Sequence, residues 1–261
     1  MSDDIVNANP KVFAIIGGSG LYEMPGFAVL DAIDTPYGVV RGIGRGMLSC
    51  VDIFFLSRHG YQHRIPPHKV NYRANIWALR YLGVTDIVAI NAVGGIHPEM
   101  GPGHLCIPDQ VIDYSWGREH TFFDGSEHCD KVSYSDFSEP FTAELRAALQ
   151  QQCESILPPN QFSYAGTYAC TQGPRLESAA EIGRIRRDGA DIVGMTLMPE
   201  AALARELELR YASLCAVVNW AAGIDPQALV MEEVMATLDE ALITVNLLVA
   251  GVINTFSQHK S

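Results

Sequence analysis

Short apolar segments alternate along the chain with segments of helical periodicity, and this alternation limits the folds open to the sequence. Runs rich in Val, Ile, Phe and Ala predict buried strands. Strands that alternate with helices favour an α/β fold in which a mixed, mainly parallel central sheet is flanked by helices on both faces. The segments predicted as strands are Val12–Ile16, Cys50–Ser57, Asp86–Ile90, Phe162–Cys170, Asp191–Met195 and 211–218.

The segments between these strands predict helices that begin and end at recognisable signals. Residues 71–83 have helical spacing and stop at Gly83, and the residues from 171 to 187 form a turn that runs into a helix. Residues 97–139 are expected to be rich in loops. Because the sequence contains no linker or repeat, we expect a flexible tail over residues 1–10 and a single domain over residues 11–261. The other predicted helices span residues 139–152, 196–208 and 230–256.

Composition and charge exclude several classes of function. The net charge of −12 argues against a nucleic-acid surface and against docking on anionic lipid. The polar N-terminal residues predict no signal peptide, and no run of about 20 apolar residues predicts a membrane span. The six cysteines form no CxxC pair and read as free thiols. These features together favour the cytoplasm.

Polar residues cluster after the predicted strands. In α/β sheets, ligands bind at the carboxyl ends of the strands, so side chains placed there are expected to share one site. Six such clusters at one edge are hard to explain by packing alone. They are Ser19, Arg58 with His59, Asn91 with Ala92, Thr171 to Glu177, Met195 with Thr196, and Asn219.

Several of these clusters suit an anion. The glycine-rich turn around Ser19 offers backbone N–H groups and a hydroxyl, Arg58 is always charged, and His59 can donate a hydrogen bond. Thr196 opens a predicted helix, where N–H groups also favour an anion. Each feature has a structural alternative: a simple turn, a surface arginine, a satisfied histidine or a helix N-cap. The turn lacks the spacing of a dinucleotide or P-loop motif.

Glu177 and Asn219 suit a purine base. A carboxylate accepts a hydrogen bond from N1–H of a 6-oxopurine, and an amide can both donate and accept at the N7/O6 edge. Each residue also has a structural alternative. Glu177 could be a carboxylate favoured in the first turn of a helix, and Asn219 could be a turn residue at the end of a strand. The histidines show no metal-ligand spacing, so no metal site is predicted, and no nucleophile motif is present.

Taken in order, these motifs resemble those of the trimeric purine nucleoside phosphorylase and methylthioadenosine phosphorylase family. The segments that carry the resemblance are GGSGLYE, SRHG, HKVNYRANIWAL, NAVGGI, GPRLESAAEI and GMTLMPEAALA, and it spans about residues 12–253. It implies a nucleoside phosphorylase fold and a homotrimer. It also implies that phosphate is held by Ser19, Arg58, His59, the Ala92 N–H and Thr196.

The resemblance assigns the remaining site residues to the nucleoside. Met195 would pack under the ribose, and Glu177 and Asn219 would read the base, with Asn219, Glu177 and His59 as the catalytic set. Tyr134 or Phe137 would reach into the site of a neighbouring subunit. The implied partners are small molecules, a nucleoside and phosphate. Inorganic phosphate would be a co-substrate, and the reaction would require no cofactor.

Departures from family patterns define the expected substrate. Members that cleave methylthioadenosine carry Ser at the position of Glu177, Asp at that of Asn219 and a second Asp at that of Ala221. The Glu/Asn pair therefore resembles the 6-oxopurine members. Many of those members carry a His that meets the 5'-hydroxyl, where this chain has Met231.

An apolar 5' pocket suits a methylthio group better than a hydroxyl, because a hydroxyl there lacks a partner. Val234 and Met235 lie beside Met231 in the sequence, whereas Tyr134 falls where methylthio-specific members often have His. The expected reaction converts S-methyl-5'-thioinosine and phosphate to hypoxanthine and 5-methylthioribose 1-phosphate. Alternatives are an inosine/guanosine phosphorylase, a methylthioadenosine phosphorylase and a non-catalytic nucleoside-binding protein.

Overall fold

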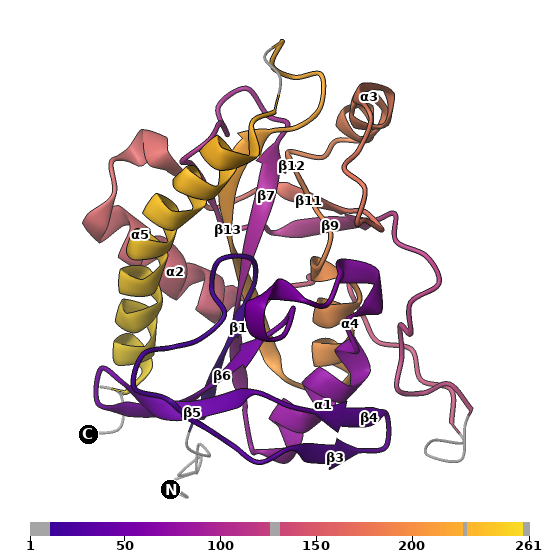
Figure 1. Ribbon diagram of the computed structural model, residues 1–261, viewed down its shortest axis with the longest axis vertical. Helices are drawn as coiled ribbons and strands as arrows, with labels where there is room; N and C mark the ends of the chain where they lie inside the picture. Colours follow the sequence, from indigo (N-terminus) through magenta and orange to yellow (C-terminus); the bar gives the residue numbers. More distant parts are fainter. Residues whose placement is uncertain (1–10, 126–130, 227–228, 258–261) are drawn as a thin grey trace, which may run out of the picture.

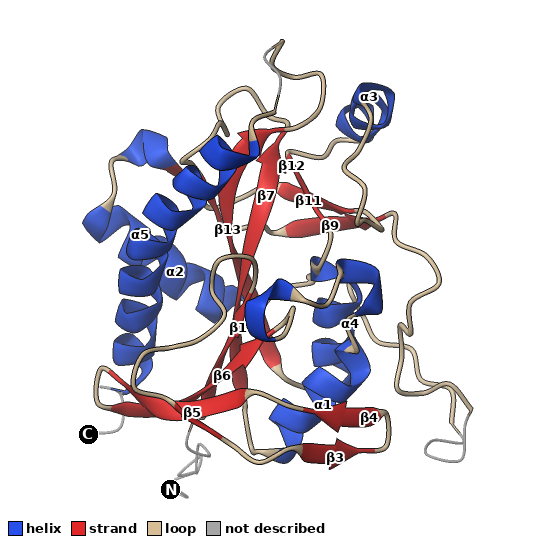
Figure 2. Cartoon of the chain, in the orientation of Figure 1, coloured by secondary structure: helices blue, strands red, loops and turns tan. Residues whose placement is uncertain are grey.

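A central mixed sheet organises the molecule, with helices against both of its faces (Figures 1 and 2). The structure is a computed structural model that describes residues 11–125, 131–226 and 229–257. The tail predicted for residues 1–10 lies outside these ranges. Within them, eleven strands join in one sheet, and a separate hairpin pairs β3 (Ile33–Thr35) with β4 (Gly38–Val40). The α/β class expected from the sequence is confirmed.

Four parallel neighbours form the middle of the sheet. Their order is β6 (Val51–Ser57), β1 (Phe13–Gly17), β7 (Asp86–Gly95) and β13 (Arg210–Trp220). All five residues of β1 are buried, as expected for a strand that is covered on both faces. Because the four strands are parallel, their carboxyl ends meet at the same edge.

The outer strands make the sheet mixed. β5 (Ile43–Leu48) is antiparallel to β6 and to β2 (Ala28–Val29), and β8 (Leu105–Cys106) is antiparallel to β13. β8 also pairs with β10 (Phe162–Ser163) in parallel. A second branch contains β9 (Gln110–Asp113), β11 (Thr167–Cys170) and β12 (Ile192–Gly194), and β12 joins it to β7 in antiparallel orientation.

One sequence expectation is wrong in this region. The single strand expected over 162–170 is divided, because β10 pairs with β8 whereas β11 pairs with β9 and β12. Side chains stabilise the break: Asp109 accepts from the Gly166 N–H and Asp191 accepts from the Thr167 N–H. The described residues of segment 97–139 are mostly loop, as expected, and the short strands β8 and β9 lie among them.

Helices cover the two faces of the sheet. On one face α2 (Ala143–Ile156) and α5 (Met231–Ser257) pack together and against β13. On the other face lie α1 (Tyr72–Tyr81) and α4 (Leu197–Glu206), and α3 (Ala179–Arg187) lies near the branch strands (Figure 1). Three-residue 3₁₀ helices occur at Tyr61–His63, Pro67–Lys69 and Pro159–Gln161.

The apolar composition of α5 has a reason within this fold. By length and composition alone the helix could cross a membrane, a feature that the sequence analysis did not anticipate. Its side chains Val245, Leu248 and Val252 are fully buried in the core that α5 shares with β13 and α2. The helix begins at the edge where the parallel strands end, so its first turn lies at the site described next.

Candidate active site

A cavity of about 1060 Å³ lies at the carboxyl-end edge of the parallel strands. It collects residues from all six predicted clusters, and residues from the beginning of α5 line it as well. Because strands β7 and β13 are longer than the apolar runs suggested, Asn91, Ala92 and Asn219 lie inside strands and not after them. The predicted site residues that line the cavity are Ser19, Arg58, His59, Ala92, Glu177, Met195, Thr196, Asn219, Met231, Val234 and Met235.

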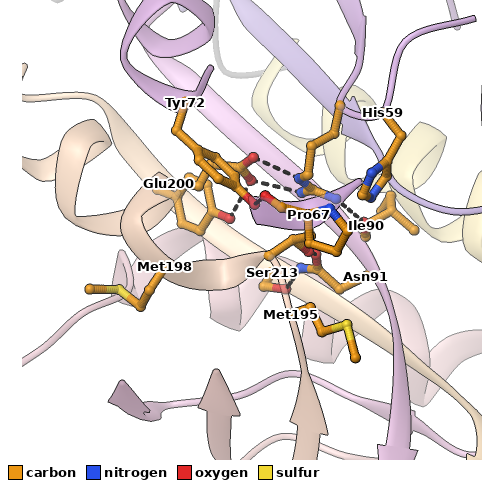
Figure 3. Close-up of polar contacts among 12 residues, drawn as sticks. His59, Pro67, Tyr72, Ile90, Asn91, Met195, Met198, Glu200 and Ser213 are labelled. Atoms are coloured by element: carbon orange, nitrogen blue, oxygen red, sulfur yellow. Dashed lines mark hydrogen bonds and ion pairs between the residues drawn. The ribbon is translucent and has the colours of Figure 1, made fainter. Parts of the chain in front are cut away.

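Arg58 is buried and forms a bidentate ion pair with Glu200, shown in Figure 3. Its Nε and Nη2 donate to the two carboxylate oxygens at 2.7 Å each, and Nη1 donates to the Ile90 carbonyl at 3.1 Å. Burial alone would lower the pKa of Arg58, but the Glu200 carboxylate outweighs it and raises the pKa above its usual value. The edge of the guanidinium that could face an anion is therefore the Nη1/Nη2 edge.

Gly18 allows this arginine to reach the cavity. A Cβ atom at Gly18 would lie 2.6 Å from the Ile90 carbonyl oxygen and 3.1 Å from Nη1 of Arg58. A side chain at this position would therefore collide with the strand and crowd the guanidinium. The adjacent Ser19 lies in the turn that follows β1 and lines the cavity.

His59 is neutral at pH 7 and has a defined tautomer. Burial, and then the charge of Arg58, lower its pKa to about 4. Its Nδ1 lies 2.8 Å from the Ile65 carbonyl oxygen, so Nδ1 carries the proton and donates. Nε2 is consequently a hydrogen-bond acceptor. The ring of His63 stacks on that of His59, with 4.3 Å between centroids.

Thr196 is held by a buried chain of polar side chains. Its hydroxyl donates to Oδ1 of Asn91 at 2.9 Å, and Nδ2 of Asn91 donates to the Ser213 hydroxyl at 2.7 Å. Ser213 in turn lies 3.3 Å from the sulfur of Cys215. Thr196 is the N-cap residue of α4, but its side chain makes no capping bond, so the simple N-cap reading does not describe it.

Glu177 and Asn219 both line the cavity, and each is held by a hydrogen bond. The hydroxyl of Thr171 donates to Oε1 of Glu177 at 2.5 Å, which fixes one carboxylate oxygen and leaves the other for a ligand. Nδ2 of Asn219 donates to the Trp220 carbonyl at 2.7 Å. The amide oxygen and the second N–H of Asn219 remain able to meet a base, as the sequence analysis expected of this residue type.

At the beginning of α5 the cavity is lined by Met231, Val234 and Met235, with Glu233 among them. Met231 is 55% exposed and Met235 is 41% exposed, although both line the cavity. Val234, between them, is partly buried against the core. Methionine is flexible and polarizable, so this turn can close on an apolar substituent.

Tyr134 and Phe137 do not line this cavity. The Tyr134 side chain is 93% exposed, and Phe137 packs against the core cluster on the α1 side of the sheet. Their predicted role concerns a neighbouring subunit and stays a prediction. Among the described residues, no cluster of three or more His, Cys, Asp and Glu side chains could hold a metal ion.

Sequence patterns did not reveal the buried polar residues that support the cavity residues. Glu200, Ser213 and Arg118 are buried and polar, and each bonds a cavity residue or its backbone. Their partners are distant in sequence, such as the 142 positions between Arg58 and Glu200. The signal available in the sequence was a charged or hydroxyl residue inside an apolar run, as Glu200 is in the predicted helix.

The sequence and fold match known proteins over nearly the whole chain. A protein of Pseudomonas syringae pv. tomato, named "Probable S-methyl-5'-thioinosine phosphorylase", is 50% identical, covering 93% of this chain and 98% of that protein. The 6-oxopurine nucleoside phosphorylase of Pyrococcus furiosus is 47% identical, covering 88% of this chain and 87% of that enzyme.

Solved structures share the fold as well. The methylthioadenosine phosphorylase of Schistosoma mansoni in complex with tubercidin superposes with a TM-score of 0.85 at 30% identity, covering 95% of this chain and 92% of that one. The sequence model of a family described as "Phosphorylase superfamily" matches residues 12–254 of this chain. This range includes every cavity residue named above. Motifs, fold and relatives thus agree, and the chain belongs to the phosphorylase superfamily.

Proposed function

We propose that this protein cleaves a 6-oxopurine nucleoside with inorganic phosphate, and that its substrate is S-methyl-5'-thioinosine. The products are hypoxanthine and 5-methylthioribose 1-phosphate, so the enzyme is a pentosyltransferase. The names of several relatives at 42–50% identity support this activity, and they divide between S-methyl-5'-thioinosine phosphorylases and 6-oxopurine nucleoside phosphorylases.

The observation that carries the proposal is that one cavity combines three kinds of group. Arg58, His59 and Thr196 offer an anion site, Glu177 and Asn219 offer hydrogen bonds to a base, and Met231, Val234 and Met235 offer apolar contacts. A methylthio nucleoside and phosphate together need these three environments. The cavity of about 1060 Å³ is large enough for both, since small-molecule sites range from about 300 to 1,000 Å³.

Phosphate would occupy the end of the cavity formed by Ser19, Arg58 and Thr196. The Nη1/Nη2 edge of Arg58, whose Nη1 also donates to the Ile90 carbonyl, would donate to the anion, and the Ala92 N–H would be a further donor. Because Nε2 of neutral His59 accepts a hydrogen bond, it matches the one protonated oxygen of hydrogen phosphate. Held in this way, phosphate is positioned below C1' as the nucleophile, which is an effect of proximity and requires no cofactor.

Cleavage makes a bond from phosphate oxygen to C1' and breaks the bond from C1' to N9 of the purine. The electron pair of the broken bond leaves with the base, so the ribose becomes positive and the purine negative in the transition state. The amide of Asn219 would stabilise the negative charge at N7/O6, and bound phosphate would stabilise the cationic sugar above Met195.

Glu177 would select the 6-oxopurine. One carboxylate oxygen accepts from Thr171, and the other would accept from N1–H, which adenine lacks. The solved relatives that act on methylthioadenosine share the fold, but the residue pair Glu177 and Asn219, together with Ala221, argues against that substrate here. Inosine/guanosine phosphorylase is the second candidate activity, because a relative named 6-oxopurine nucleoside phosphorylase is 47% identical in sequence.

The working unit we propose is a cytoplasmic homotrimer that acts on small molecules and does not bind nucleic acid or membrane. In such a trimer, Tyr134 or Phe137 of one subunit would approach the cavity of the next. The 93% exposure of Tyr134 in the single chain supports a role for this segment at a subunit contact.

The reaction class is tested by incubating the protein with S-methyl-5'-thioinosine in the presence and absence of phosphate. Hypoxanthine release is followed by absorbance, and the sugar product by phosphorus NMR. We expect hypoxanthine only with phosphate and in equal amount to a sugar 1-phosphate. Release without phosphate would indicate a hydrolase, and nucleoside binding without release would indicate a binding protein.

A further inference from the structure

Arg118 makes an unusual set of contacts behind the cavity. It lies in the segment between β9 and α2, and it is 9% exposed. Nη2 donates to the carbonyls of Thr171 and Gln172 at 3.0 and 2.9 Å. Nη1 donates to the carbonyls of Met195 and Met198 at 2.9 and 2.5 Å. One guanidinium thus binds two pairs of backbone carbonyls from two segments of the chain.

The two segments carry different halves of the site. Residues 171–177, here called the base arm, lead from β11 to Glu177, and the Thr171 hydroxyl bonds that carboxylate. Residues 194–198, here called the phosphate turn, contain Met195 and Thr196. The Thr171 N–H donates to the Gly194 carbonyl at 2.8 Å where the arm and the turn begin. Beyond that bond, the base arm and the phosphate turn run apart into separate turns. Arg118 bonds backbone carbonyls of both.

The geometry of this contact requires an arginine. A guanidinium has five N–H donors in a rigid plane, and here Nε also donates to Oε1 of Gln172 at 3.1 Å. A lysine has three donors on one atom and cannot hold two carbonyl pairs at a fixed separation. Substitution by lysine therefore keeps the charge and removes the geometry.

The charge of Arg118 has no acidic partner at ion-pair distance among the residues that the structure describes. Burying a cation in this way is unfavourable unless its hydrogen bonds compensate, and an apolar side chain often stabilises such a position as well. Stability alone therefore does not explain why an arginine occupies this position. The alignment of the two segments explains it better.

We propose that Arg118 is a positioning residue that fixes the base arm relative to the phosphate turn. It touches neither substrate, but it sets the distance between the groups that read the purine and those that hold phosphate. This inference rests on the proposed function. A displacement of about 1 Å between reacting groups can cost about a hundredfold in rate, so the alignment matters for catalysis.

The test is the conservative variant Arg118→Lys, assayed in the full-length protein with S-methyl-5'-thioinosine and phosphate. We expect kcat/KM to fall by about 100-fold, with KM for both the nucleoside and phosphate raised. We also expect the preference for the 6-oxopurine over methylthioadenosine to shrink, because Glu177 loses its fixed position. A purely structural role would lower the active fraction and leave both KM values and the substrate preference unchanged.

Arg146 offers a matched control. It also donates to two backbone carbonyls, those of Pro108 and Tyr164, but neither belongs to the base arm or to the phosphate turn. Arg146→Lys removes a similar clamp elsewhere, so we expect kcat and both KM values within about twofold of the parent. Equal losses in the two variants would overturn the proposal.

Hydrogen exchange separates a failure of this inference from a failure of the proposed function. Arg118→Lys should speed amide exchange in residues 171–177 and 194–198, whereas Arg146→Lys should leave both segments unchanged. This readout needs no substrate. If the parent protein cleaves no nucleoside, the proposed function fails while exchange still decides whether Arg118 holds the two segments. Unchanged exchange in Arg118→Lys would contradict the inference.

Discussion

Arg58 and Glu200 form a fully buried, bidentate ion pair that holds Arg58 along one edge of its guanidinium. The two side chains are 0% and 2% exposed, and two N–H groups of Arg58 meet the carboxylate at 2.7 Å. The hydroxyl of Tyr211 donates to the same carboxylate at 2.8 Å. A guanidinium held along one edge can turn only the other edge to the cavity, so Glu200 determines how Arg58 meets an anion.

Glu200→Gln should weaken both stability and phosphate binding. Removing one partner leaves the Arg58 charge buried and uncompensated, which typically costs about 3–5 kcal/mol. We expect a comparable loss in the free energy of unfolding by urea and a raised KM for phosphate. Tyr211→Phe removes one donor from the same carboxylate but keeps the charge pair, and it should cost about 2 kcal/mol. Parent-like stability and phosphate KM in Glu200→Gln would show that the pair does not place Arg58.

The double change Glu177→Ser with Asn219→Asp should move the base preference toward 6-aminopurines. A serine hydroxyl can donate to N1 of adenine, and a carboxylate can accept from its amino group. We expect the ratio of kcat/KM for methylthioadenosine over S-methyl-5'-thioinosine to rise by tenfold or more, roughly 1.4 kcal/mol in the transition state. The single changes are the controls. An unchanged ratio would mean that these residues do not read the base.

His59 should make the protein less stable in acid. Its pKa is about 4 in the folded protein and 6.5 ordinarily, so between these values the unfolded chain binds a proton that the folded protein does not. The contribution to stability is complete above about pH 6.5 and is lost as the pH falls toward 4. It should amount to about 2 kcal/mol between about pH 7.5 and pH 5.

The measurement is urea unfolding at these two pH values for the parent and for His59→Asn. Asparagine retains a donor for the Ile65 carbonyl but does not titrate, so the pH dependence should shrink by that amount. His97→Asn changes a partly exposed histidine outside the cavity and should keep the parent's dependence. The same pH dependence in all three proteins would refute a buried neutral His59.

Met231→His should move the 5' preference from methylthio toward hydroxyl. An imidazole gives a 5'-hydroxyl a hydrogen-bond partner and removes apolar contact from a methylthio group. We expect kcat/KM for inosine relative to S-methyl-5'-thioinosine to rise by about tenfold or more, within the range for a gained polar contact. Met47→His, at a methionine that is 62% exposed and outside the cavity, is the control. An unchanged ratio would place the 5' substituent elsewhere.

Local pattern was sufficient to predict the strands that form the middle of the sheet and the edge at which the site lies. Buried apolar runs and helical periodicity are properties of neighbouring residues, so β1, β6 and α1 were found within one or two residues of their observed ends. The divided strand at 162–170 was missed because its two halves differ in pairing partners, which no local pattern records.

The residues that support the site could not be predicted from the sequence, because their roles also depend on partners that are distant in sequence. Arg118 bonds backbone carbonyls 53 to 80 positions away and Glu200 bonds an arginine 142 positions away, and only the packed fold brings them together. The state of His59 also depends on the fold, since burial and the neighbouring charge of Arg58 set its pKa. Residue types therefore predicted most of the groups that line the cavity, and the structure was needed for how they are held.

The central claim is tested most directly by comparing kcat/KM for S-methyl-5'-thioinosine, inosine and methylthioadenosine on one preparation at saturating phosphate. We predict that S-methyl-5'-thioinosine leads both others by at least about tenfold, roughly 1.4 kcal/mol in the transition state. A lead for inosine would preserve the reading of Glu177 and Asn219 and contradict that of Met231. A lead for methylthioadenosine would contradict the account of the base site itself.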